Sequence, residues 1–210
     1  MFGLFDIKFE IFGCTIKLNF YFFAMLAFML VMDPSGLMIF GVLSALMHEF
    51  GHITAMILQK NYIKEIWFGF FSLGIVDSKR ILRSYRENIF VLISGSFINF
   101  VMAFILKLVY LYTGMNIINV IFYQNIYIGI LNLLPISILD GGQIAFIILE
   151  KKIGLNKALK VTQVISITIL MPILVMGFLI LLQSKYNFSL LILGCYLMAY
   201  LIFKDDYLFV

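Results

Sequence analysis

The fold and the candidate chemistry of this chain both start from the stretch His48-Glu49-Phe50-Gly51-His52. It holds the 2 histidines of the sequence, four positions apart, with a glutamate beside the first. Residues at this spacing lie on one face of an α-helix, so both imidazoles can reach a single metal ion. The apolar run 37–58 around them has no other charged residue and is long enough to cross a bilayer. Ionisable groups are costly there and usually functional, so we expect a metal site inside a membrane span.

The composition indicates a polytopic membrane protein. Hydrophobic residues make up 63% of the 210 positions and charged residues 12%, and the mean hydropathy is +1.08. A water-soluble domain of this length could not carry so apolar a surface. The net charge of +4 does not indicate nucleic-acid binding, because the basic residues lie in short segments between apolar runs. Cys14 and Cys195 lack the spacing of a thiolate zinc site or a redox motif.

We expect an α-helical polytopic membrane protein with six transmembrane helices and short interfacial β-hairpins, folded as a single domain over residues 1–210. The predicted spans are 18–32, 37–59, 89–112, 117–135, 158–182 and 188–203. Alternation of apolar and polar residues predicts a hairpin over 5–18, and aromatic, β-branched and glycine residues predict another over 66–76. Pro135 should kink or end the fourth span, which places 140–142 on an irregular stretch beyond it.

The basic residues predict the orientation. With six crossings, both termini and the segments 60–87 and 150–160 share one side of the membrane. All of the 15 Lys and Arg residues except Lys107 and Lys185 lie on that side. The positive-inside rule makes it cytoplasmic. The composition, rich in isoleucine, lysine and asparagine, is typical of an AT-rich bacterial genome. We therefore expect a multi-pass protein of the bacterial cell membrane with cytoplasmic termini and an active site open to the cytoplasmic side.

A catalytic zinc ion takes three protein ligands and leaves the fourth position for water, so one further donor is needed. The candidates in or near spans are Glu49, Asp77, Glu87, Asp140 and Glu150. Asp140 is favoured, because it lies between a proline-broken helix and two glycines whose backbone can aim it into the membrane. The alternative for Asp140 is a helix cap for the segment that starts at Gln143. The alternative for the histidines, hydrogen bonding between helices, leaves Glu49 unexplained.

Two motifs in different spans carry a resemblance to a known family. One is His48-Glu49-x-Gly51-His52, and the other combines Asn132-Leu133-Leu134-Pro135 with Asp140-Gly141-Gly142. Together they resemble the motifs of the site-2 protease family of intramembrane zinc metalloproteases, along nearly the whole chain. Gly95 and Asn99 match a further family segment, in which Ser96 stands where proline is common.

The resemblance implies a role for each motif residue. It implies that His48, His52 and Asp140 bind Zn²⁺, that Glu49 is the catalytic acid-base, and that Asn132 positions the substrate. The residues expected to be structural around the site are Gly51, Pro135, Gly141 and Gly142. Zinc would then make its bound water acidic, and Glu49 would take the proton and pass it to the leaving amine.

Within the family, a compact core without a PDZ insertion is most similar to the sporulation-type branch, such as stage IV sporulation protein FB. That branch releases a membrane-tethered pro-sigma factor, and many of its members carry a CBS domain that we do not expect here. The resemblance implies regulated intramembrane proteolysis of a membrane-tethered protein within the lipid bilayer. It leaves room for an inhibitory membrane partner and implies no nucleic-acid partner.

Two other functions stay open from the sequence. A divalent-metal transporter would also need histidines and a carboxylate, but transport needs successive weak sites, whereas the donors here lie at one depth. A catalytically silent relative would bind membrane proteins without cutting them, and the intact Glu49 argues against it. The 66–76 hairpin could offer a strand edge to an extended substrate, or it could be an interfacial anchor rich in aromatic residues.

Overall fold

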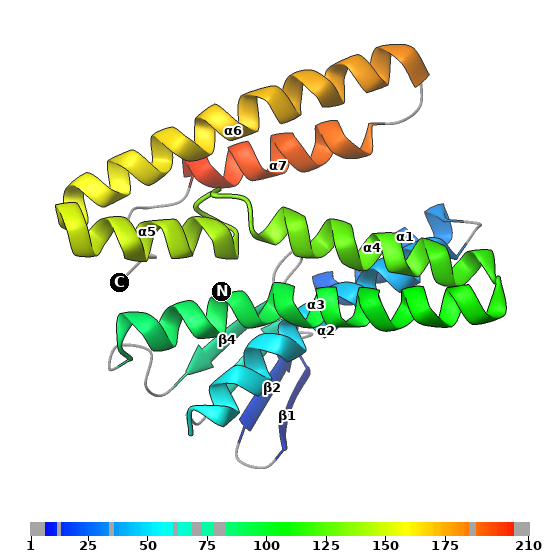
Figure 1. Cartoon of the computed structure of the whole chain (residues 1–210), viewed down its shortest axis with the longest axis horizontal. Helices are drawn as coiled ribbons and strands as arrows, with labels where there is room; N and C mark the ends of the chain where they lie inside the picture. Colours follow the sequence, from blue (N-terminus) through cyan, green and yellow to red (C-terminus); the bar gives the residue numbers. More distant parts are fainter. Residues whose placement is uncertain are drawn as a thin grey trace. The chain divides into compact units, whose positions relative to one another are not determined.

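The computed structural model describes residues 7–11, 14–33, 36–60, 63–68, 73–77, 83–184 and 188–203. The elements run in the order β1 (Ile7–Ile11), β2 (Cys14–Leu18), α1 (Phe20–Met32), α2 (Leu37–Leu58), β3 (Ile63–Phe68), β4 (Leu73–Asp77), α3 (Tyr85–Thr113), α4 (Asn116–Asn132), α5 (Asp140–Ile153), α6 (Leu155–Ser184) and α7 (Ser189–Phe203) (Figure 1). The chain divides into two compact units, Met1–Gly129 and Ile130–Val210. The single domain over 1–210 stays a prediction.

The described part of the chain is mostly helical, and three of its helices are long and apolar enough to cross a membrane. These are α2, α3 and α6, with 22, 29 and 30 residues. The predicted spans coincide with these three helices and with the shorter α1, α4 and α7, of 13, 17 and 15 residues. Because a bilayer core needs about 20 helical residues, the shorter helices do not establish crossings by length, and six spans stay a prediction.

Both predicted hairpins are confirmed, and they join into one sheet that the sequence did not predict. The strand order is β1-β2-β3-β4. β1 pairs with β2 and β3 with β4 in antiparallel fashion, whereas β2 and β3 are parallel, with Thr15 opposite Glu65. An ion pair between Lys17 and Glu65, 2.5 Å from Nζ to Oε2, spans the parallel pair. The turns of the hairpins, 12–13 and 69–72, lie outside the described residues.

Small residues bring α2 and α3 close together in the first unit. A Cβ atom at Gly51 would lie 2.5 Å from the backbone oxygen of Ser94, so only glycine permits this approach. Farther along α2, Ala55 and Met56 pack with Val91 in a buried cluster. Since residues later in α2 meet residues earlier in α3, the two helices run antiparallel. Close backbone approach through small residues is the usual packing of membrane helices.

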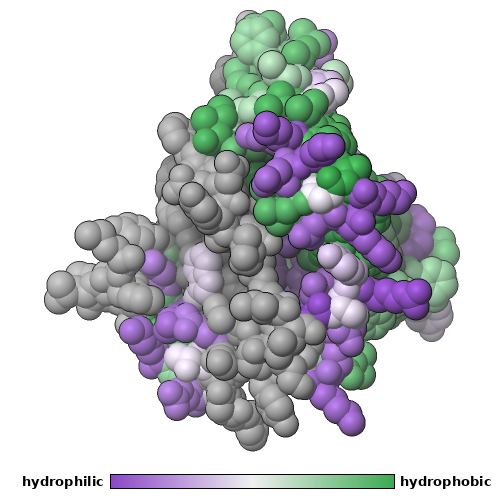
Figure 2. All heavy atoms as spheres, turned by 90° about the vertical axis from the view of Figure 1, so that its left-hand side faces the viewer, coloured by the Kyte–Doolittle hydropathy of each residue, from purple (hydrophilic) through white to green (hydrophobic). Residues whose placement is uncertain are grey.

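The second unit is built on α5, α6 and α7. Its core consists of Ile136, Leu170, Leu197 and Leu201. α5 turns into α6 at Gly154, whose φ of 78° is a conformation that favours glycine. The lysines around this turn, Lys151, Lys152, Lys157 and Lys160, are exposed. Figure 2 looks from the side on which this turn lies and shows hydrophilic residues gathered on that face.

The segment 140–142 corrects one prediction from the sequence. It is not irregular, because α5 begins at Asp140 and its N-cap residue is Leu139. The N-cap is therefore not Asp140. α4 ends at Asn132, before Pro135, because a proline ring disfavours the helical conformation of the residue that precedes it. Gly141 and Gly142 are needed for contact, since a Cβ on them would run into the carbonyls of Leu133 and Ile136.

Candidate metal centre

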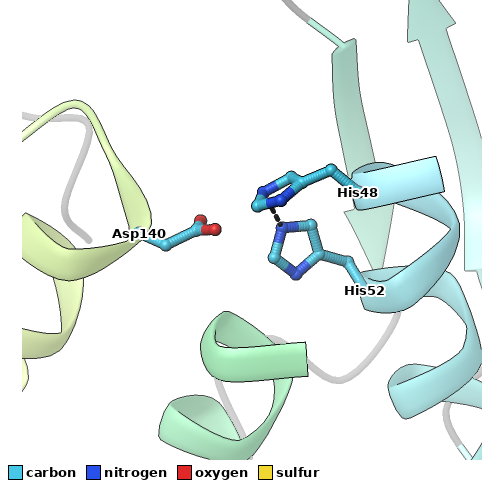
Figure 3. Close-up of side chains that lie close together, drawn as sticks. All are labelled: His48, His52 and Asp140. Carbon is cyan, nitrogen blue, oxygen red and sulfur yellow. Dashed lines mark hydrogen bonds between the residues drawn. The ribbon is translucent and has the colours of Figure 1, made fainter. Parts of the chain in front are cut away.

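α2 places the two histidines on its buried face, one turn apart. Their relative exposures are 4% for His48 and 7% for His52. The Nε2 atoms of the two rings lie 3.1 Å apart, and the ring planes are nearly perpendicular, at 86° (Figure 3). The helix spacing that the sequence predicted is therefore confirmed, with both imidazoles turned toward one point.

The hydrogen bond made by Nδ1 of His52 determines whether Nε2 of the same ring has a lone pair. His52 Nδ1 lies 2.8 Å from the carbonyl oxygen of Val91 on α3. A carbonyl only accepts hydrogen bonds, so Nδ1 carries the proton and donates it. Nε2 is then left with a lone pair that faces His48. A backbone carbonyl that orients a histidine in this way is typical of metal ligands.

The spacing of the two nitrogens fits a metal ion. Two nitrogen ligands at a tetrahedral zinc ion, each about 2.0–2.1 Å from the metal, are roughly 3.3 Å apart. The observed separation of 3.1 Å between the Nε2 atoms of His48 and His52 is close to that value. Imidazole nitrogens are also donors that zinc prefers. The two residues together therefore fit two positions of a zinc site.

Gly95 on α3 completes the surroundings of the two rings. A Cβ atom there would lie 2.6 Å from Cε1 and Nε2 of His52 and 2.7 Å from Cε1 of His48. The backbone of α3 at Gly95 is therefore in direct contact with both imidazoles. Gly51, predicted to be structural, supports the same contact from α2, since it lets the two helix backbones touch.

Glu49 follows His48 on α2 and is partly exposed. Successive residues of an α-helix are about 100° apart around the axis, so its carboxylate lies beside the histidine face rather than on it. This position suits a group that acts on a metal-bound ligand without binding the metal itself. Its role as acid-base stays a prediction.

Asp140 and Asn132 belong to the second unit. Asp140 is the first residue of α5 and is 9% exposed; Figure 3 labels it at the start of that helix. A carboxylate in a first helical turn is stabilised by the helix dipole. Asn132 is the last residue of α4 and is partly buried. The structure thus brings His48 and His52 together within one unit, and the participation of Asp140 and Asn132 is part of the proposal below.

The remaining carboxylates considered from the sequence have other positions. Glu87 forms a capping box at the start of α3, where its Oε2 accepts a hydrogen bond from the backbone N–H of Ser84 at 2.8 Å. Asp77 ends β4, and Glu150 lies near the end of α5, partly exposed. The capping contact of Glu87 in particular is structural. Among the candidates whose burial the structure describes, Asp140 is the buried carboxylate.

Sequence reasoning missed the group that fixes the segment before Asp140. The backbone N–H of Ser137 donates to Oγ of Ser166 at 2.8 Å, and that hydroxyl donates to the carbonyl of Thr162 at 2.7 Å. Ser166 and Thr162 are 0% and 1% exposed. Hydroxyl residues four apart in an apolar helix are the signal that could have indicated such a contact, although it does not identify the partner.

Known proteins resemble this chain in sequence over part of its length and in fold over most of it. The family model "Peptidase family M50" matches residues 113–176, which include Asn132 and Asp140. The solved structure "Site-2 Protease from Methanocaldococcus jannaschii" is 23% identical, with a TM-score of 0.67 and 94% of each chain covered. The chain has the fold of a site-2 protease. None of the curated proteins matches the sequence.

The two matches provide information on the fold and on the broad class of protein. The fold expected from the motif resemblance is confirmed. The family match, together with the apolar helices, supports a metallopeptidase of a membrane. The sporulation branch, the substrate and the identity of the metal stay predictions.

Proposed function

We propose that this chain is an intramembrane zinc metallopeptidase that hydrolyses a peptide bond in or near the membrane segment of a membrane-tethered protein. The observation that carries the proposal is the pair of buried Nε2 atoms of His48 and His52, 3.1 Å apart. They lie on an apolar helix of 22 residues with Glu49 beside them. The match to the M50 family supports the same class of reaction.

In this proposal His48, His52 and Asp140 hold the ion, each with one ligand atom. Two imidazoles and one carboxylate are a donor set that zinc accepts, and the fourth position stays open for water. When bound, zinc supplies the Lewis acidity that makes this water acidic near neutral pH. Asp140 is suited to its part because the two following glycines and the N-cap at Leu139 fix it at the start of α5.

Glu49 moves the proton. Its carboxylate takes a proton from the reacting water while the water attacks the peptide carbonyl, and then gives it to the leaving amide nitrogen. The product nitrogen leaves as an amine, so the carboxylate returns to its starting state. Partial exposure of Glu49 is compatible with exchange of this proton.

A helical substrate must be unwound before attack, because its carbonyls are engaged in its own hydrogen bonds. β4 could hold the unwound segment: among the described strands it pairs only with β3, so its other edge can accept an extended peptide. Asn132, with an amide that both donates and accepts, would position the peptide backbone. Pro135 follows the end of α4 at Asn132. Because proline lacks a backbone N–H, the helical hydrogen bonds do not continue through this region.

The further elements of the proposal concern setting and substrate. Six spans with cytoplasmic termini in a bacterial cell membrane would open the site to the cytoplasm, where the basic segments lie. A pro-sigma factor or a similar membrane-tethered regulator is the proposed substrate, released during sporulation by regulated intramembrane proteolysis. An inhibitory membrane partner would fit such regulation.

The test is co-expression of wild type, Glu49→Gln and Glu150→Gln with a tagged, membrane-tethered pro-sigma factor. Glu49→Gln should keep its zinc, measured by elemental analysis, and lose release of the soluble fragment. Glu150→Gln makes the same change at a partly exposed position on α5, and this variant should cleave the substrate as wild type does. Undiminished processing by Glu49→Gln would remove that residue from catalysis. Metal flux into liposomes without cleavage would instead favour the transporter.

A further inference from the structure

The interface of α2, α3 and α4 contains polar atoms that the metal centre does not account for. Ser96 and Asn99 on α3 are 0% exposed, and Asn125 on α4 is 3% exposed. Ser96 Oγ, both amide atoms of Asn99, and Oδ1 of Asn125 have no hydrogen-bond partner among the described residues. Buried polar groups are nearly always hydrogen-bonded to protein or to ordered water, so these four atoms point to a ligand.

The helix contacts place Asn99 directly beyond the histidines. In the antiparallel pair, Gly51 meets Ser94, and the ring of His48 meets Gly95. Asn99 is four residues after Gly95 and therefore lies on the same face of α3, one turn farther along. Ser44 is four residues before His48 and lies one turn along α2 in the same direction. Asn99 is thus next to the histidine level on the side of Ser44.

α4 closes the cluster from the third side. Nδ2 of Asn125 donates to Oγ of Ser44 at 2.9 Å and to the carbonyl of Ile121 at 3.0 Å. A Cβ at Gly129 would lie 2.9 Å from the ring of Phe100. Because Phe100 directly follows Asn99, α4 packs against α3 near the position of Asn99. The Ser44–Asn125 hydrogen bond therefore forms the far end of a row that begins at His48 and passes Asn99.

The chemistry of the four atoms matches water. The amide of Asn99 offers donors and an acceptor, Oγ of Ser96 offers both, and Oδ1 of Asn125 only accepts. A buried water molecule makes about three hydrogen bonds with such a mixed set. A role of Asn99 in joining helices by a direct hydrogen bond would need a protein partner, and the described residues provide none.

We propose that Ser96, Asn99 and Asn125 bind ordered water in the interface of α2, α3 and α4. We further assign to this water a hydrogen bond to the reacting water beside His48, a part that rests on the proposed function. Asn99 is then a positioning residue, which acts on the reaction through bound water. The site lies away from the predicted cytoplasmic opening, since it extends from His48 toward the start of α2.

The first experiment is a structure of the full chain, loaded with zinc, at a resolution that shows ordered water. Water within hydrogen-bonding distance of the Asn99 amide is expected. An Asn99 amide bonded to a protein group, or surrounded by apolar atoms alone, would overturn the proposal. This result does not depend on hydrolysis, so the water site and the proposed function can fail separately.

The second experiment compares Asn99→Leu, which keeps the size of the side chain but binds no water, with Asn116→Leu as control. Asn116 lies on the same helix as Asn125, nine residues earlier, and is exposed. Asn99→Leu should bind one metal per chain as wild type does, change the visible spectrum of the Co²⁺-loaded protein, and lower kcat about tenfold at unchanged KM.

Asn116→Leu should leave the spectrum and both kinetic constants unchanged. Asn99→Ser, which keeps a hydroxyl and leaves room for water, should retain most of kcat. If Asn99→Leu does not fold, the ordered water sought in the first experiment decides the proposal. A wild-type Co²⁺ spectrum and wild-type kcat in folded Asn99→Leu would contradict the link between this water and the reaction.

Discussion

Gly95 and His52 meet across the interface of α2 and α3 with no space for a side chain between them. A Cβ atom at Gly95 would lie 2.6 Å from both Cε1 and Nε2 of the imidazole. On its other side, the same ring is held by the hydrogen bond from Nδ1 to the carbonyl of Val91 at 2.8 Å. α3 therefore fixes His52 both by contact and by hydrogen bonding, and it sets the direction of the Nε2 lone pair.

Gly95→Ala should weaken metal binding, because the added methyl group displaces the rings that it meets. Changes in the groups that orient metal ligands typically cost about 10–100-fold in affinity. Competition with a chromophoric chelator measures this change. Gly41→Ala on α2 is the control, since its added methyl group would meet no atom within 4 Å. Equal zinc affinities of the two variants would show that α3 does not position the rings.

Removal of one ligand should remove the metal. Asp140→Asn keeps the shape of the side chain at the start of α5 but replaces the anionic carboxylate, an oxygen ligand that zinc binds, with a neutral amide. We expect Asp140→Asn and His52→Ala to lose most bound zinc in elemental analysis of the purified protein, and Glu150→Gln to keep it. A full zinc content in Asp140→Asn would place the third ligand elsewhere.

The local part of the site could be predicted from the sequence. The spacing of His48 and His52 fixes them on one helix face whatever surrounds the helix, because it depends only on the helical period. The same holds for the two hairpins, whose strands are close in sequence. These features follow from residues that are near one another along the chain.

Contacts between distant segments could not be predicted in this way. The parallel pairing of Thr15 with Glu65 joins two hairpins about 50 residues apart, and neither strand encodes that choice of partner. The start of α5 at Asp140 was missed, because two glycines disfavour a helix by propensity. Their reason lies in packing, since the carbonyls of Leu133 and Ile136 leave no room for a Cβ.

Gly142→Ala should disrupt the segment before α5. The methyl group would run into the carbonyl of Ile136, a backbone atom in a fully buried residue that cannot turn aside. We expect the free energy of unfolding to fall by about 1–3 kcal/mol, the usual effect of overpacking. The change should be seen as a lower melting temperature in detergent. Gly194→Ala is the matched control, because its added methyl group would meet side-chain atoms of Leu174 and Ile173 rather than backbone, so it should cost less. Equal melting temperatures of the two variants would mean that the segment yields easily.

Ser166→Ala should loosen the same segment without adding any atom. The backbone N–H of Ser137 would lose its acceptor, and a buried donor without a partner costs about 1–3 kcal/mol. Because this hydrogen bond ties the segment before Asp140 to α6, we expect both a lower melting temperature and weaker zinc binding. Thr168→Ala on the same helix removes an exposed hydroxyl that donates to the carbonyl of Val164, four residues earlier in the same helix, so it should change neither measurement. If Ser166→Ala lowers the melting temperature but leaves zinc affinity intact, the hydrogen bond stabilises α6 without positioning Asp140.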